Sequence, residues 1–88
     1  MLDERRQEAR EEIAVPGTIY DKQGCFLLPC VVRDLSKKGG RLELFKEAAL
    51  PQYFLLSLMP DGSERRLCTS VWQLGLVVGA RFVQQTAV

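Results

Sequence analysis

Six short stretches of strand-forming residues, separated by turn residues, run through this chain from about Glu12 onward. Short strands at close intervals are typical of an all-β barrel or sandwich. The expected strands span approximately Ile13 to Tyr20, Phe26 to Arg33, Arg41 to Phe45, Tyr53 to Leu58, Arg65 to Gln73 and Leu76 to Val83. Gly24 and the pair Asp61-Gly62 mark hairpin turns, because glycine takes a positive φ without steric cost. Neighbouring strands should therefore be mostly antiparallel.

Alternation of apolar residues predicts which side of two strands faces the core. Leu42 and Leu44 lie on one side of the third expected strand. In the sixth, the residues that share one face are Leu76, Val78, Ala80 and Phe82. Residues 46–50 could form one helical turn, although Pro51 disfavours helix at the residue before it. We expect the single tryptophan, Trp72, in the core or at the barrel rim rather than as a stacking platform, since a large aromatic side chain usually buries.

Length and composition limit the chain to one soluble domain. Its 88 residues leave no room for a second globular domain. No apolar run approaches the ~18 residues that a membrane span requires, so we expect no membrane insertion. The net charge of +1 argues against a nucleic-acid polymer as partner, because such binding needs a strongly basic face. The start Met1-Leu2-Asp3-Glu4 lacks an apolar signal core, which predicts a cytoplasmic protein.

Nucleophiles and metal ligands are scarce in this sequence. Cys25, Cys30 and Cys68 show no C-x-x-C spacing and the chain has no histidine, so neither a disulfide framework nor a typical zinc site is predicted. We interpret the three cysteines as small buried hydrophobic residues. Ser36 has no histidine to act as its base. The sequence therefore predicts no enzyme, no metal site and no cofactor.

The first twelve residues carry a cluster of arginines, Arg5, Arg6 and Arg10, among five acidic residues. The composition of this segment favours a helix, but a helix would place like charges side by side. The two effects nearly cancel, so helix propensity does not decide the structure of the segment. We predict that residues 1–12 form a flexible exposed arm that leads into a single barrel domain over residues 13–88. Clustered guanidiniums suit phosphate oxygens or a guanine edge. An Arg-x3-Arg spacing alone is a weak signal, and a solvated charged terminus is the alternative.

A second polar motif, Asp34-Leu35-Ser36-Lys37-Lys38-Gly39-Gly40, follows the second expected strand. Its carboxylate and hydroxyl offer an acceptor and a donor to the hydrogen-bonding face of a base. The same residue types are also typical of a hairpin turn that caps its own backbone, and the two lysines are typical of a solvated turn. Together with the arginine cluster, this motif indicates a nucleotide ligand.

The order and spacing of the two motifs resemble the PilZ family, whose pattern is R-x-x-x-R and then [D/N]-x-S-x-x-G. The residues that fill all five positions are Arg6, Arg10, Asp34, Ser36 and Gly39. Val71-Trp72 followed by Gly79-Ala80-Arg81-Phe82 is similar to the end of PilZ sequences, and Cys30 to Ser36 is similar to the strand that enters the second motif. The resemblance covers nearly the whole chain.

The resemblance implies a six-stranded antiparallel β-barrel that binds cyclic di-GMP, a bacterial second messenger. In family terms, Arg6 and Arg10 engage phosphate oxygens and a guanine edge. Asp34 accepts hydrogen bonds from guanine and Ser36 bonds a base or a phosphate. The glycines, Gly39 and Gly40, complete the expected ligand site by letting the backbone approach closely.

Further features of the sequence bear on how a PilZ-like chain would work. An arginine directly before the first motif, here Arg5, is associated in this family with an intercalated ligand dimer. Glu8, Glu11 and Glu12 place carboxylates near a ligand with two negative charges, which should weaken binding. The chain stops at Val88, so we expect no long C-terminal helix and a barrel surface left for a partner.

These features predict a cyclic di-GMP receptor or adaptor whose arm orders on the ligand and signals to an unidentified downstream protein. The main alternative is a PilZ-like protein-interaction domain that does not bind nucleotide. A small barrel that binds oligonucleotides is a weaker alternative, because the net charge is only +1.

Overall fold

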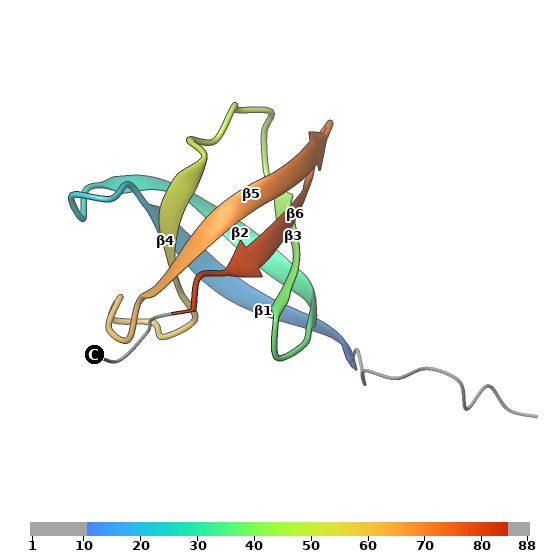
Figure 1. The fold of residues 1–88 in the computed structure, drawn as a ribbon, viewed down its shortest axis with the longest axis horizontal. Coiled ribbons are helices and arrows are strands. Elements are labelled where there is room, and N and C mark those ends of the chain that lie inside the picture. The colour runs from blue at the N-terminus through green and yellow to red at the C-terminus, as the bar shows by residue number, and fades with distance from the viewer. Residues whose placement is uncertain (1–10, 85–88) are drawn as a thin grey trace, which may run out of the picture.

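Residues 11–84 of the computed structural model form a closed barrel of six antiparallel strands (Figure 1). The strands are β1 (Glu11–Tyr20), β2 (Phe26–Leu35), β3 (Gly39–Leu44), β4 (Tyr53–Ser57), β5 (Arg66–Leu74) and β6 (Val77–Phe82). Their order around the barrel is β1-β2-β3-β6-β5-β4, and β1 pairs with β4 to close it. The predicted fold class is confirmed. This described part of the chain contains no helix, hence none that could cross a membrane.

Several strand limits differ from those predicted. β1 begins at Glu11 rather than Ile13, because its pairing with β2 continues to Glu11 and Leu35. β3 begins at Gly39 rather than Arg41, so the polar turn between β2 and β3 contains only residues 36–38. Residues 46–50, where one helical turn was conceivable, lie in an irregular loop. The barrel therefore begins directly after the first motif and extends into the second, further than alternation alone predicts.

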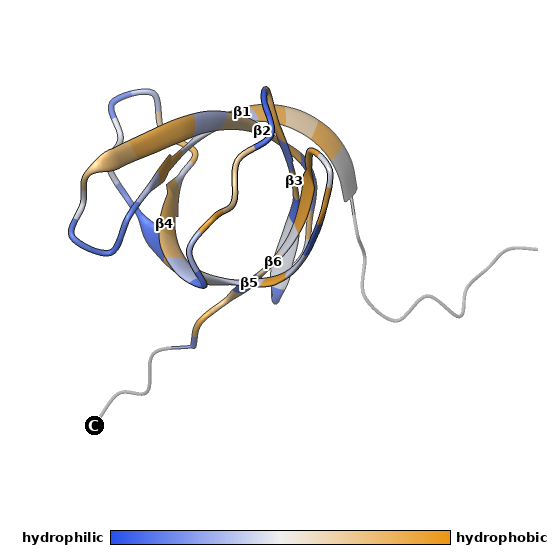
Figure 2. Ribbon diagram, turned by 90° about the horizontal axis from the view of Figure 1, so that it is seen from above, coloured by the Kyte–Doolittle hydropathy of each residue, from blue (hydrophilic) through white to orange (hydrophobic). Residues whose placement is uncertain are grey.

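The inward residues of the six strands form one hydrophobic core. Viewed from above, the strands close into a ring around it (Figure 2). The buried hydrophobic residues are Ile19, Leu28, Cys30, Val32, Leu42, Leu44, Phe54, Leu56, Cys68, Val78, Ala80 and Phe82. The predicted inward faces of β3 and β6 are thus confirmed, with Leu76 half-buried against the core.

Two prolines lie inside strands at points where each strand has one neighbour only. Pro16 pairs with β2 but precedes Thr18, the first residue of β1 that pairs with β4. Pro29 pairs with β1 but precedes Cys30, the first residue of β2 that pairs with β3. Proline lacks an N–H and is tolerated where no neighbouring strand requires one.

One end of the barrel is fastened by Arg65. Its guanidinium lies 3.7 Å from the ring centroid of Tyr20, and its Nε donates to the carbonyl of Gly62 at 2.7 Å. The contact joins the β1 end to the turn between β4 and β5. Gly62 and Gly24 have φ of 79° and 93°, as the predicted turns require. Arg65 therefore stabilises this end of the barrel.

Two of the three cysteines are buried in the core, as predicted. Burial, reinforced by the nearby Cys68 thiol, raises the pKa of the Cys30 thiol from 9.0 to about 12. Burial likewise raises the pKa of Cys68 to about 11, against a smaller lowering by Arg66. The prediction is wrong for Cys25, which is exposed because it lies in the β1–β2 turn, where its N–H donates to Oδ1 of Asp21 at 2.9 Å.

The buried thiols predict a loss of stability at alkaline pH. Below pH 9 the folded and unfolded chains both keep these protons, whereas above it the unfolded chain releases them first. The free energy of unfolding should fall between pH 9 and 11, by roughly 1 kcal/mol per thiol at pH 10. Urea unfolding of wild type and of a Cys30→Val, Cys68→Val variant checks this. A variant that keeps the whole wild-type pH dependence contradicts the assignment.

Candidate functional site

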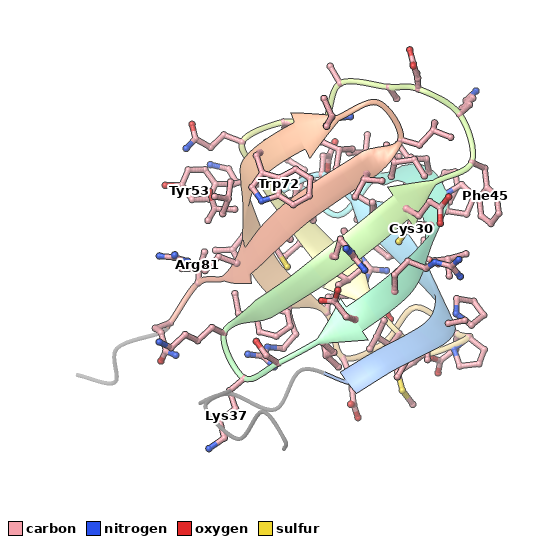
Figure 3. The ribbon with its side chains drawn as sticks, turned by 90° about the vertical axis from the view of Figure 1, so that its right-hand side faces the viewer. Cys30, Lys37, Phe45, Tyr53, Trp72 and Arg81 are labelled. Carbon is pink, nitrogen blue, oxygen red and sulfur yellow. The ribbon has the colours of Figure 1, made fainter. Side chains whose placement is uncertain are left out.

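A cavity of about 320 Å³ lies over the β2–β3 turn and strands β3, β5 and β6. Its size is at the lower end of the range for ligand pockets, about 300–1,000 Å³. The residues that line it are Asp34, Ser36, Lys38, Gly39, Gly40, Arg41, Val71, Trp72, Gly79, Ala80 and Arg81. Figure 3 shows Trp72 over the β5–β6 hairpin and Arg81 further along β6. All four predicted residues of the second motif border this one cavity.

Strand register brings residues that are far apart in the sequence into one row across the cavity. Trp72 of β5 is the Cα partner of Gly79 in β6. Gly79 is in turn the partner of Arg41 in β3, and Arg41 is the partner of Asp34 in β2. An indole, a glycine, a guanidinium and a carboxylate thus follow one another across four adjacent strands.

Asp34 is placed by a β-bulge. Val32 pairs with Leu42, whereas Asp34 pairs with Arg41, so Arg33 is an extra residue in β2. A bulge bends its strand and re-aims the neighbouring side chains. Among the interactions of Asp34, its Oδ2 accepts a charge-assisted hydrogen bond from Nε of Arg41 at 3.0 Å. Asp34 borders the cavity with only 2% of its surface exposed.

Ser36 supports the turn in which it lies. Its N–H donates to the carbonyl of Gly39 at 2.8 Å, and its Oγ accepts from the N–H of Lys38 at 3.2 Å. The hydroxyl also reaches the Gly39 carbonyl at 3.4 Å. The hairpin interpretation of the motif is therefore confirmed for Ser36, whose hydroxyl caps its own turn.

The two motif glycines allow neighbouring strands to approach closely. A Cβ added to Gly39 would overlap the carbonyl oxygen of Ala80 and lie 2.8 Å from Cα of Arg81, both in β6. A Cβ on Gly40 would lie 2.5 Å from the carbonyl oxygen of Asp34. The sequence predicts a close approach of ligand to backbone here. The structure shows that the approaching backbone belongs to the barrel itself.

Trp72 lies outside the core, the first of the two positions predicted for it, and 48% of its surface is exposed. A second bulge explains this position, because Ser70 pairs with Ala80 while Trp72 pairs with Gly79, which leaves Val71 as the extra residue. The indole ring covers Gly79, where an added Cβ would overlap the ring. One side of Trp72 is thus packed on β6, and Trp72 also lines the cavity.

The described charges around the cavity favour an anion. Lys38, Arg41 and Arg81 face a single acidic residue, Asp34, although the whole chain carries only +1. Sequence reasoning did not assign these three cations or Trp72 to the site. Strand pairing across β3, β5 and β6 is the signal that brings them together, and single-strand patterns do not contain it.

The first motif lies outside the described residues, which include none of Arg5, Arg6, Arg10 and Glu8. The described chain begins with Glu11, whose Cα partner is Leu35, and Glu12 is the partner of Asp34. β1 therefore begins directly beside the second motif. Residues 11–84 contain no group of three or more His, Cys, Asp or Glu side chains that could hold a metal ion.

Comparison with protein-family models and with curated proteins gives no match. No family model matches this chain, and no curated protein matches it. The resemblance to the PilZ family therefore depends on the motif residues and their spacing alone.

The close contact at Gly39 predicts a stability defect. Gly39→Ala should lower the free energy of unfolding by about 1–3 kcal/mol, because its methyl group would overlap backbone atoms of β6, which cannot rotate away. Gly17→Ala is the matched control, since its nearest neighbours are side-chain atoms at 3.3 Å. Urea unfolding of both variants measures the difference. Equal stabilities would show that the β3–β6 approach tolerates a side chain.

Proposed function

We propose that this protein is a non-enzymatic, cytoplasmic receptor of the PilZ type. It binds cyclic di-GMP in the cavity over β3, β5 and β6 and signals to a downstream protein. The proposal applies the resemblance in the sequence to the cavity that is bordered by Asp34, Ser36, Gly39 and Gly40 of the second motif.

The observation that carries the proposal is the position of the second motif, which borders one cavity and lies beside the start of β1. Asp34, Ser36, Gly39 and Gly40 border one cationic cavity, and β1 begins beside Asp34. Arg10 and Arg6 come two and six residues before Glu12, the Cα partner of Asp34. A ligand with two phosphates and two guanine bases matches a cavity that offers guanidiniums, an indole and a carboxylate.

Each part of the ligand has a group of suitable chemistry in the cavity. Arg81 and Lys38 supply positive charge for the phosphates, in addition to Arg6 and Arg10. The exposed face of Trp72 can stack a planar base, an interaction worth about 1–3 kcal/mol. Asp34 accepts hydrogen bonds from a guanine edge.

The burial of Asp34 links binding to a conformational change. Only 2% of this residue is exposed, so a base that reaches its carboxylate has to displace what covers it. Binding then changes the surface around the cavity, in keeping with an arm that orders on the ligand. That surface is what a downstream protein would distinguish.

A second function, a PilZ-like interaction domain without nucleotide, is favoured by a different observation. The described motif residues all have a structural role: Asp34 pairs with Arg41, Ser36 caps its turn, and Gly39 packs against β6. Such a chain could keep the motif for folding alone. Ligand binding distinguishes the two functions.

Calorimetric titration with cyclic di-GMP tests the receptor. We expect micromolar or tighter binding, with NMR shifts in residues 34–41 and 71–81, and little binding of GMP. Arg81→Ala should weaken binding by about 1.5–3 kcal/mol, since it removes a charge-assisted contact. Arg33→Ala is the control, because Arg33 is equally cationic and does not line the cavity. Absence of heat and of shifts in wild type would favour the interaction domain.

The arginine before the first motif predicts the stoichiometry. Two intercalated cyclic dinucleotides carry four negative charges, which one Arg-x3-Arg pair neutralises poorly. We expect two ligands per chain in wild type and a fall toward one, with lower affinity, in Arg5→Ala. The same calorimetric titration gives both the number of ligands bound per chain and the affinity. Saturation at one ligand in both proteins would leave Arg5 without a role in binding.

A further inference from the structure

The ion pair between Arg41 and Asp34 differs from the other described arginine pair on β2 and β3. Nε of Arg41 lies 3.0 Å from Oδ2 of Asp34, whose side chain is 4% exposed. Nε of Arg33 lies at the same distance from Oε1 of Glu43, but that carboxylate is 41% exposed. Water screens an exposed ion pair of this kind, so the pair holds neither side chain firmly in place. A buried carboxylate in a low dielectric is held more firmly by the same bond.

The position of Arg41 makes it suited to orient Asp34 rather than only to attract an anion. It lies directly opposite Asp34 in the β2–β3 register and opposite Gly79 in the β3–β6 register, so strands on both sides fix its backbone. Nε is the least mobile donor of the guanidinium, because it lies nearest the main chain. Its bond to Oδ2 therefore contributes to holding the Asp34 carboxylate in one direction.

A carboxylate in a fixed direction can distinguish guanine from adenine. Guanine offers two adjacent donors, N1–H and the 2-amino group, which match the two oxygens of one carboxylate. Adenine offers an acceptor, N1, at the corresponding position, where a carboxylate repels it. Hydrogen-bonded recognition of this kind rejects a mismatched base only if the protein group cannot turn away.

We infer that Arg41 is a positioning residue that fixes the Asp34 carboxylate and thereby makes the cavity select guanine over adenine. This inference rests on the proposed function, since it concerns the base of the same cyclic dinucleotide. It assigns a role to a residue outside both sequence motifs.

The test compares the dissociation constants of cyclic di-GMP and cyclic di-AMP. Wild type should prefer the guanine ligand, and Arg41→Gln should reduce the ratio of the two constants by about tenfold or more, the discrimination expected of one bidentate base contact. Arg41→Lys keeps the charge but lacks the planar donor at Nε. It should recover part of the affinity for both ligands without recovering the ratio. Arg33→Gln, which breaks the exposed pair with Glu43, should change neither the two dissociation constants nor their ratio.

The outcomes separate this inference from the proposed function. If wild type binds neither dinucleotide, the receptor proposal fails and the inference fails with it. If wild type prefers cyclic di-GMP and Arg41→Gln keeps that preference, Arg41 does not set the choice of base, although the receptor stands. Recovery of the full ratio by Arg41→Lys would mean that charge alone is responsible. Should Arg41→Gln not fold, the ratio measured for Arg41→Lys decides the question.

Discussion

The pairing of β3 with β6 is the interaction on which the rest of the structure depends. It joins two meanders of three strands, β1-β2-β3 and β4-β5-β6, whose second strand pairing, between β1 and β4, comprises only three residue pairs. The two backbones approach so closely that Gly39 cannot carry a side chain. The N–H of Phe82 extends the seam by donating to the carbonyl of Lys38 at 2.7 Å. The cavity lies across this seam and takes residues from both meanders.

The sequence predicts much of the fold because local patterns determine it. Alternation identifies the inward residues of β3 and β6, and glycines with positive φ mark the turns at residues 24 and 62. The site is harder to predict, because two β-bulges decide which way its side chains point. The extra residues Arg33 and Val71 re-aim Asp34 and Trp72, and no period-2 pattern contains that information.

The residues of the second motif stabilise the barrel, in addition to any role in ligand binding. Gly39 and Gly40 are required by strand packing, and Ser36 closes the turn that leads into the seam. A motif of this kind would persist in a chain that had lost its ligand, because its residues still stabilise the fold. The groups around it that fold alone does not require, such as the exposed side chain of Arg81, are therefore better indicators of binding than the motif itself.

A cavity across the seam also connects binding with barrel closure. A ligand that contacts Asp34 and Arg81 together touches both meanders, and its binding energy is then available only when β3 and β6 are paired. A ligand that binds the folded but not the unfolded chain raises the free energy of unfolding. At high ligand concentration the increase is proportional to the logarithm of the ligand concentration divided by the dissociation constant. In this barrel that stabilisation acts at the non-local pairing between the two meanders. The charges at this seam favour an anionic ligand, because three cationic side chains line the cavity of a chain whose net charge is only +1.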